Sequence, residues 1–498
     1  MENQEIRLKY SGLILFGSRL LSVITGLAFI LMITRSVSVE EFGIWGNLND
    51  VLSYFILLAN VIPFWTTRFV ARTHSGAAGT GLIANLFVSF GSTTIYLALF
   101  STILSTLQIS ANYAPLYGIA AIQIVELHMV SALEAVLHAR QPQAIGYGLL
   151  LNEGIKVILG FILISQFKLG LLGALIAIAG SHLIQIAFYI GIVAKELREG
   201  VRWTYLREWI KASLINIYNI IGSRIAAMPL ILLFIHSELA RSYYGAAFTI
   251  ANVVTYSTFL SYALYPRLLS KSNSQDVSTS LKMVLMPAIP MTIGVIVLSD
   301  SYLTILRQEY LEARLVLIIL AIWVFSEALL QVFRVVALGT EKIDVKAKIP
   351  FRQLPRTKLF QIFTIPYIQS AITLPATFIM LSFADDSSLV AATYLAMINL
   401  IVGLAMLVVT YRISRRCLTF HFPWRSIEKY LLASTVMAMI LILAPHPSRI
   451  TSTLILTGVG GIAYFIVLAL FDVDTRELMK SILGETKARL SQEKQGKS

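Results

Sequence analysis

The stretch SGLILFGSRLLSVITGLAFILMIT, residues 11–34, decides the fold class of this chain. It exceeds the roughly 20 apolar residues that a helix needs to cross a bilayer, and it is too long for the apolar region of a cleavable signal peptide. The sequence therefore predicts a membrane-spanning helix here. Arg19 lies inside it, and a guanidinium in the middle of a bilayer costs roughly 2.5–3.5 kcal/mol. We expect the Arg19 side chain to face a wet cavity or a polar partner rather than lipid.

Similar apolar segments recur along the 498 residues, of which 57% are hydrophobic and 13% are charged. Globular chains carry about 25% charged residues, so the composition predicts an all-α polytopic membrane protein. About fourteen spans are expected, at 11–34, 44–66, 81–104, 115–138, 144–166, 170–194, 210–235, 243–265, 283–300, 315–338, 361–383, 388–410, 428–444 and 451–471. The connections between them are brief, which leaves no room for a soluble catalytic domain.

The positive charges alternate from one connection to the next. Of the 40 Lys and Arg residues, thirty fall in the termini and in or at the edge of the connections after even-numbered spans, with Lys211 and Lys429 counted at such edges, and six in the connections after odd-numbered spans. This bias follows the positive-inside rule. It predicts a cell-membrane protein with both termini cytoplasmic, and it explains the net charge of +13 without nucleic acid. The single cysteine, Cys417, excludes an intramolecular disulfide.

The chain shows signs of an internal duplication. The tripeptide Gly-Ser-Arg ends at Arg19 in the first span and at Arg224 in the seventh, and in both halves an aromatic-Gly pair is followed eleven residues later by a tyrosine. Spans 1 and 7 both start from the cytoplasm, so the repeat is expected to be parallel. We predict a lobe at 1–194, an interfacial linker at 195–209, a lobe at 210–410, an extra helix pair at 428–471 and a cytoplasmic tail at 472–498.

Residues 10–75 carry a resemblance to a known family. The first helix contains FGSRLL, the following loop EEFG, and the second helical stretch closes with RFVAR. These features resemble the polysaccharide-transport branch of the multidrug/oligosaccharidyl-lipid/polysaccharide exporter superfamily, whose members are flippases for lipid-linked oligosaccharides. The resemblance implies two six-helix lobes, alternating access, and a cavity between spans 1, 2, 7 and 8. It also implies that cationic residues of the first helix meet the substrate's diphosphate, a role that falls to Arg19 and its repeat partner Arg224.

Other polar residues inside the spans are candidates for substrate binding or ion coupling. Asn47 and Asp50 lie near the implied cavity, and Asp50 either holds Arg19 in place or carries a coupling cation. Arg334 is a further substrate-binding candidate, although pairing with an acid is its more ordinary role. Glu327 stands two turns before it on a similar face and is a candidate for ion coupling.

A second set of candidates lies in spans 4 and 5. Glu153 and Lys156 are three residues apart on one helical face, so they are expected to pair with each other; a coupling role for this pair is the alternative. Glu126 and His128 could relay protons, but a spacing of two residues points them to different sides of their helix.

The leading hypothesis is a flippase for a polyprenyl- or dolichyl-(di)phosphate oligosaccharide. We expect it to act as a monomer among membrane lipids, beside glycan-assembly enzymes, with no cofactor and with Na⁺ or H⁺ as the coupling ion. One alternative is a cation-coupled multidrug exporter of the same superfamily; its first helix would carry an acid, where this chain has Arg19. The other alternative is a membrane glycan polymerase or ligase. No enzyme motif occurs in the sequence, so we expect no enzymatic activity.

Overall fold

The computed structural model describes residues 8–37, 39–106, 109–306, 308–343, 355–384, 387–445, 449–472 and 476–477. These residues form helices, and no strand occurs among them. Thirteen helices in the described ranges are long and apolar enough to cross a membrane. The predicted all-helical polytopic membrane fold is confirmed. Its physical basis is that a helix satisfies every backbone hydrogen bond within its own segment, as a bilayer requires.

The chain divides into two compact units. The first comprises Met1–Ile6, Ile14–Ile217 and Glu341–Thr357, and the second comprises Arg7–Leu13, Tyr218–Thr340 and Lys358–Ser498. The lobe boundaries expected from the sequence stay predictions beside this division. Helix α9 begins at Trp203, inside the linker expected at 195–209, and continues to Ala226. Trp209, expected at the membrane interface, is fully buried and packs edge-on against Phe69.

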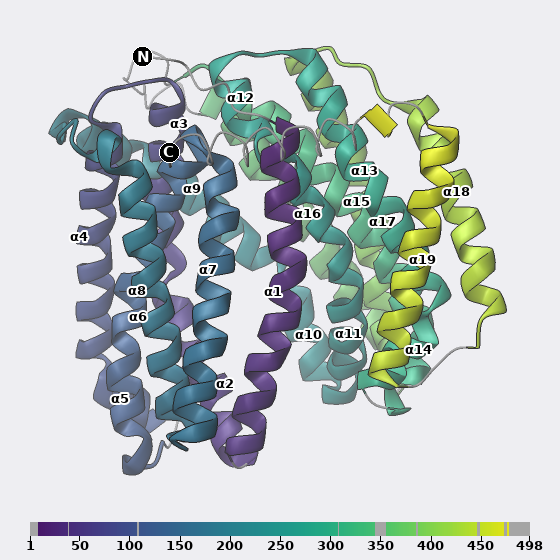
Figure 1. The fold of residues 1–498 in the computed structure, drawn as a ribbon, viewed down its shortest axis with the longest axis horizontal. Coiled ribbons are helices and arrows are strands. Elements are labelled where there is room, and N and C mark those ends of the chain that lie inside the picture. Colours follow the sequence, from purple (N-terminus) through teal and green to yellow (C-terminus); the bar gives the residue numbers. More distant parts are fainter. Residues whose placement is uncertain are drawn as a thin grey trace, which may run out of the picture. The chain divides into compact units, whose positions relative to one another are not determined.

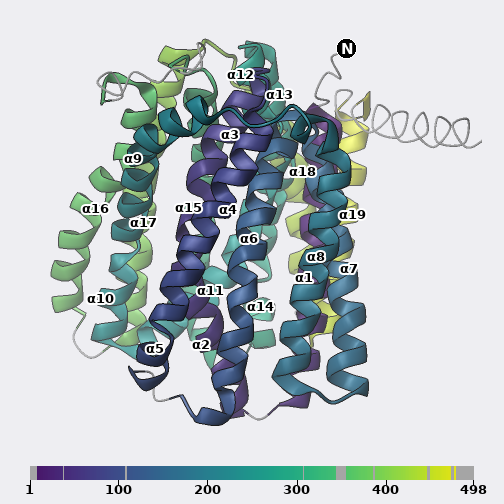
Figure 2. The same ribbon diagram turned by 90° about the vertical axis from the view of Figure 1, so that its left-hand side faces the viewer.

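The first unit contains most of α1, the helices that follow it and α9 as far as Ile217. Its elements are α1 (Leu8–Ser36), α2 (Val39–Phe55), η1 (Leu57–Asn60), α3 (Val61–Ala71), α4 (Ala77–Ala98), α5 (Phe100–Thr106), η2 (Ala111–Tyr113), α6 (Ala114–Arg140), α7 (Pro142–Gly160), η3 (Phe161–Gln166) and α8 (Gly170–Leu197). Helices α6, α7 and α8 pack against one another (Figure 1), and Figure 2 shows α7 and α8 side by side. This three-helix group carries the buried acids discussed below.

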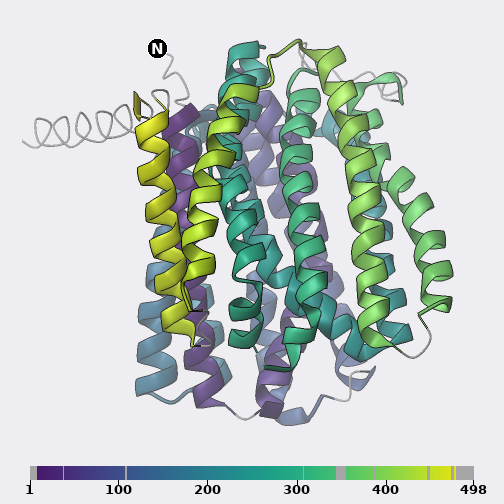
Figure 3. The same cartoon turned by 90° about the vertical axis from the view of Figure 1, so that its right-hand side faces the viewer.

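The second unit contains the remaining helices. After α9 (Trp203–Ala226) come α10 (Met228–His236), α11 (Glu238–Ala251), η4 (Asn252–Ser261), α12 (Leu264–Ser270), α13 (Ser274–Val297), α14 (Ser299–Leu306), η5 (Gln308–Ala313), α15 (Arg314–Gly339), α16 (Lys358–Ser382), α17 (Ser388–Cys417), α18 (Trp424–Leu443) and α19 (Ile450–Phe471). Helices α18 and α19, the yellow-green pair in Figure 3, lie side by side. Their outward residues are apolar and open, with Leu443 86% and Ile455 67% exposed, as expected for a surface that meets lipid.

The second membrane-crossing stretch is interrupted in each unit. In the first unit, α2, η1 and α3 follow one another, and the span expected at 44–66 is not among the thirteen candidates. In the second unit, α11, η4 and α12 repeat this order. Tight 3₁₀ turns inside a helix often mark strain or a hinge. Pro63 stands in the first turn of α3, where its missing N–H costs no helical hydrogen bond.

Candidate functional site

Arg19 lies half-buried in the middle of α1, which crosses α7 closely. A side chain at Gly146 of α7 would come within 2.8 Å of Ile14 and 3.0 Å of the Ser18 hydroxyl, so this glycine sets the crossing. The Ser18 hydroxyl donates to the carbonyl oxygen of Ile14 at 2.6 Å, within its own helix. The neighbouring Arg19 is the charged residue on this part of the helix. Small residues at the contact commonly allow membrane helices to cross this closely.

The acid that attracts Arg19 is Glu134 of α6. The Tyr189 hydroxyl lies 3.1 Å from Glu134 Oε1 and 3.2 Å from the carbonyl oxygen of Ile145, and it can donate its proton to either. The amide of Gln185 donates to the same hydroxyl at 2.9 Å. Arg19 therefore has a buried carboxylate nearby, which supports an arginine that stays charged inside the membrane.

Gly148 makes room for the Tyr189 ring. A Cβ at this position would lie 2.0 Å from Tyr189 Cε1, and the tyrosine is completely buried. We expect Gly148→Ala to lower the free energy of unfolding in detergent by about 1–3 kcal/mol, because the ring can move only by overpacking the core and leaving Glu134. Thermal unfolding checks this. Gly154→Ala on the same helix is the control, since its Cβ would meet nothing within 4 Å; an equal loss in both variants would contradict the assignment.

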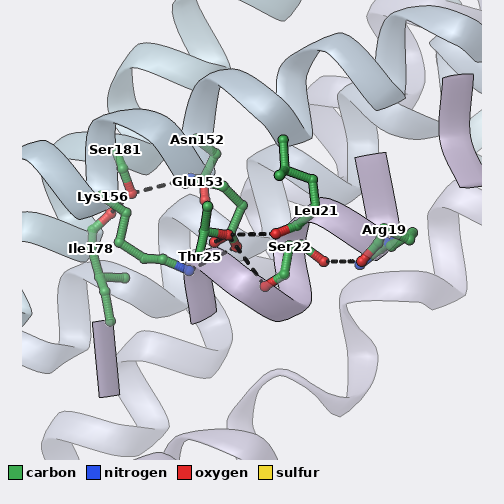
Figure 4. A network of polar contacts seen from close by, with 9 residues as sticks. All are labelled: Arg19, Leu21, Ser22, Thr25, Asn152, Glu153, Lys156, Ile178 and Ser181. Atoms are coloured by element: carbon green, nitrogen blue, oxygen red, sulfur yellow. Dashed lines mark hydrogen bonds and ion pairs between the residues drawn. The ribbon is translucent and has the colours of Figure 1, made fainter. Parts of the chain in front are cut away.

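A second polar group joins α1 to α7. Glu153 receives the Thr25 hydroxyl at 2.7 Å and the Lys156 ammonium at 2.7 Å, one on each carboxylate oxygen (Figure 4). The expected pair of Glu153 and Lys156 is therefore present. Next to it, the amide of Asn152 donates to the Ser181 hydroxyl of α8 at 3.1 Å. Glu153 is satisfied by two donors, and its coupling role stays a prediction.

Glu126 and His128 do not contact each other. His128 is buried and bonds through Nδ1 to the carbonyl oxygen of Ile124 on its own helix, 2.8 Å away. Glu126 faces α8 instead, with its Oε2 3.5 Å from Nδ1 of His182. The divergence of these side chains is what their two-residue spacing predicts. The partner His182 was not among the residues selected from the sequence.

Arg224 lies in the last turn of α9 and is exposed. A cation suits this position, because the last turn of a helix carries partial negative charge. The Ser223 hydroxyl donates to the carbonyl oxygen of Asn219 at 2.9 Å, as Ser18 does to Ile14. The preceding glycine differs between the repeats: Gly222 is covered by the Tyr367 ring, whereas a Cβ at Gly17 would meet nothing within 4 Å.

Of the four remaining candidates, the structure describes the side chains of two, Glu327 and Arg334. Glu327 and Arg334 of α15 are half-buried and attract each other along one face of the helix. Arg334 Nε is buried and has no hydrogen-bond partner among the described residues. The side chains of Asn47 and Asp50 lie outside the described residues. In the described part of the chain, no group of three His, Cys, Asp or Glu residues could hold a metal ion.

Three residues that the structure places beside Arg19 or Glu126 were missed by sequence reasoning: Glu134, His182 and Tyr189. Glu134 and His182 did carry a usable signal, since both are ionisable groups inside apolar segments. Tyr189 carried none, because tyrosines are frequent in this chain and only its contact with Gly148 distinguishes it.

Comparison with known proteins gives the fold. No family model and no curated protein matches the sequence. Solved structures do match: the bent form of the MATE transporter VcmN of Vibrio cholerae aligns with TM-score 0.60 and 16% identity over 83% of this chain and 99% of that one. This chain has a MATE-transporter fold. A MOP superfamily transporter of Pyrococcus furiosus, described as having a binding pocket of reverse polarity that suggests a different function, aligns with TM-score 0.61 and 13% identity over 82% and 95%. The MATE transporter ClbM in complex with Rb⁺ aligns with TM-score 0.60 and 12% identity over 85% and 97%.

Proposed function

We propose that this chain is a flippase that moves a lipid-linked oligosaccharide across the cell membrane by alternating access. The substrate class is a polyprenyl or dolichyl phosphate or diphosphate that carries a glycan for polysaccharide assembly. Both termini would be cytoplasmic, and the residues 1–194 and 210–410 would act as the two moving lobes. Glycan-assembly enzymes would supply the substrate and take up the product.

The observation that carries the proposal is the charge of the first helix. Between residues 11 and 34 the only charged residue is Arg19, and no acid is present. A guanidinium binds phosphate through two parallel, charge-assisted hydrogen bonds and stays protonated at all physiological pH values. Glu134 can hold Arg19 when no substrate is bound, and Arg224 offers an exposed second guanidinium in the repeat position. The Pyrococcus furiosus relative with a pocket of reverse polarity gives this reading a precedent within the fold.

The second candidate is a cation-coupled multidrug exporter, which the fold allows equally. Its support is the set of acids inside the first unit, the buried Glu126 and Glu153 and the half-buried Glu134, together with the Rb⁺ complex of ClbM. An exporter of hydrophobic cations needs an acid facing its substrate. Each of these three acids has a basic group or a hydroxyl beside it.

Transport in reconstituted vesicles separates the two functions. We expect the purified protein to move a fluorescent polyprenyl-diphosphate oligosaccharide across the bilayer, measured by quenching from outside, and to leave the distribution of a hydrophobic dye cation unchanged. A polyprenol glycan without phosphate is the matched control and should not move. Dye export without movement of the phosphate-bearing lipid would overturn the flippase proposal and favour the exporter.

A further inference from the structure

Helix α13 of the second unit carries two prolines in its interior, Pro287 and Pro290. A proline has no N–H, so Pro290 leaves the carbonyl oxygen of Met286, four residues earlier, without its helical hydrogen bond, and its ring crowds that carbonyl. Met286 is buried. A buried polar group without a partner is costly, so the middle of α13 depends on a donor from outside the helix.

The donor comes from α19, at the far end of the sequence. The Tyr464 hydroxyl donates to the carbonyl oxygen of Met286 at 2.6 Å, and the tyrosine is completely buried. Neighbouring helices commonly satisfy the backbone groups that a proline frees inside a membrane. The bond therefore acts on the backbone of α13, at the residue where the helical hydrogen bonding is interrupted, rather than on a side chain.

Two further contacts fasten the helix pair α18–α19 on either side of this bond. Near the start of α13, the Ser278 hydroxyl donates to the carbonyl oxygen of His421, just before α18, at 2.8 Å. Beyond the end of α13, the hydroxyls of Tyr302 in α14 and Thr457 in α19 lie 2.8 Å apart. Helix α18 also packs directly on α13. The pair is thus anchored to α13 and α14 on both sides of the residue that Pro290 leaves without a donor.

The corresponding helix of the first unit has neither the prolines nor the cover. Helix α4 follows α3 in the first unit as α13 follows α12 in the second, and its sequence contains no proline. Its outward side chains are open, with Phe87 61% and Ile95 56% exposed, whereas residues 283–290 of α13 are all buried. The weakened helix and the helix pair that supplies its missing donor therefore occur together in one unit.

We infer that Tyr464 is a positioning residue for transport, which sets the bend of α13 by holding the carbonyl oxygen of Met286. A proline inside a helix creates a kink, and a bond formed in only one bent state favours that state. Helix α13 packs against both η4 and α15, so its bend positions the interrupted span of the second unit and the helix that carries Glu327 and Arg334. The inference rests on the proposed function only for its transport measurement.

A double-mutant cycle on the thermal unfolding of the purified protein tests the bond itself. Tyr464→Phe removes only the hydroxyl and should lower the unfolding midpoint, because the Met286 carbonyl loses its donor. Pro290→Ala supplies the missing N–H, so the loss caused by Tyr464→Phe should shrink by at least about half in that background. Pro287→Ala is the matched control: it restores a donor to Met283 instead, and the full loss should persist. Equal losses in the wild-type and Pro290→Ala backgrounds would overturn the inference.

Turnover in reconstituted vesicles, normalised to folded protein, tests the role in transport. Hydrogen bonds between membrane helices shift an equilibrium about three-fold on average and up to roughly twenty-fold, and we expect Tyr464→Phe to slow flipping of the lipid-linked oligosaccharide within this range. In the Pro290→Ala background, the same change should slow it no further.

Two outcomes separate this inference from the proposed function. If Tyr464→Phe lowers the unfolding midpoint but leaves the turnover rate unchanged, the bond is only structural and the positioning role is refuted, while the flippase proposal stands. If the wild-type protein moves no lipid-linked oligosaccharide although the unfolding cycle behaves as expected, the flippase proposal is refuted, while the bond between Tyr464 and the Met286 carbonyl stands.

Discussion

Replacing Arg19 and Arg224 together with alanine is expected to abolish translocation of the lipid-linked oligosaccharide while the protein still folds and inserts. Each guanidinium would donate charge-assisted hydrogen bonds to phosphate, and losing one such bond costs on the order of 1.5–3 kcal/mol. That corresponds to roughly a ten- to hundred-fold loss in affinity for each arginine. The measurement is the initial rate of flipping in vesicles, normalised to the amount of inserted protein.

The variants Arg19→Lys and Glu134→Gln distinguish a role of Arg19 in substrate binding from a role in folding. Arg19→Lys should restore only part of the activity, because an ammonium keeps the charge but loses the planar two-pronged geometry. Arg198→Ala, an exposed cation at the end of α8, is the matched control and should be fully active. If Arg19 serves only to neutralise Glu134, Arg19→Ala will lower expression and a second change, Glu134→Gln, will restore both expression and transport. Full activity of the double alanine variant would end the phosphate hypothesis.

Hydropathy alone located thirteen of the expected spans, because each contains an apolar helical stretch long enough to cross the bilayer. The exception is the stretch 44–66. Its backbone changes from α2 to the 3₁₀ turn η1 and then to α3, and the span located at 239–270 changes in the same way from α11 to η4 and then to α12. Hydropathy measures transfer from water to lipid and contains no information on where the hydrogen-bond pattern shifts. Similarly, the sequence gives no signal that a helix begins or ends at residue 209. Helix α9 begins at Trp203 and runs through this position, and composition does not reveal that continuity.

Short-range contacts of the candidate site were predictable and long-range contacts were not. The pairing of Glu153 with Lys156 follows from helical spacing alone. The contact of Glu126 with His182 depends on how α6 packs on α8, and the attraction of Arg19 to Glu134 depends on the crossing of α1 with its neighbours. From the sequence, Asp50 either holds Arg19 in place or carries a coupling cation, because it lies near the implied cavity. The described residues offer Glu134 for that role.

The second large effect is expected on stability, when the ion pair of Glu153 and Lys156 is broken. Lys156→Met should reduce the stability of the folded protein by about 3–5 kcal/mol, because it leaves a carboxylate buried without its charged partner. The side chains of Glu153 and Lys156 are only 11% and 15% exposed, so water can replace little of the lost interaction. Thermal unfolding in detergent and the yield of inserted protein are the measurements. Lys211→Met, which removes a half-exposed lysine 3.9 Å from Glu208, is the control and should cost less than about 1 kcal/mol.

The double variant Glu153→Gln, Lys156→Met distinguishes a structural pair from a coupling site. Removing both charges ends the burial penalty, and the glutamine amide oxygen can still accept the Thr25 hydroxyl that now bonds Glu153 at 2.7 Å. We therefore expect stability to return to within about 1 kcal/mol of wild type. We expect transport to return with it, because both charged groups are satisfied within the protein. A double variant that folds as well as wild type but has lost transport would show that Glu153 acts in the transport cycle, as its coupling role predicts, and does more than join α1 to α7.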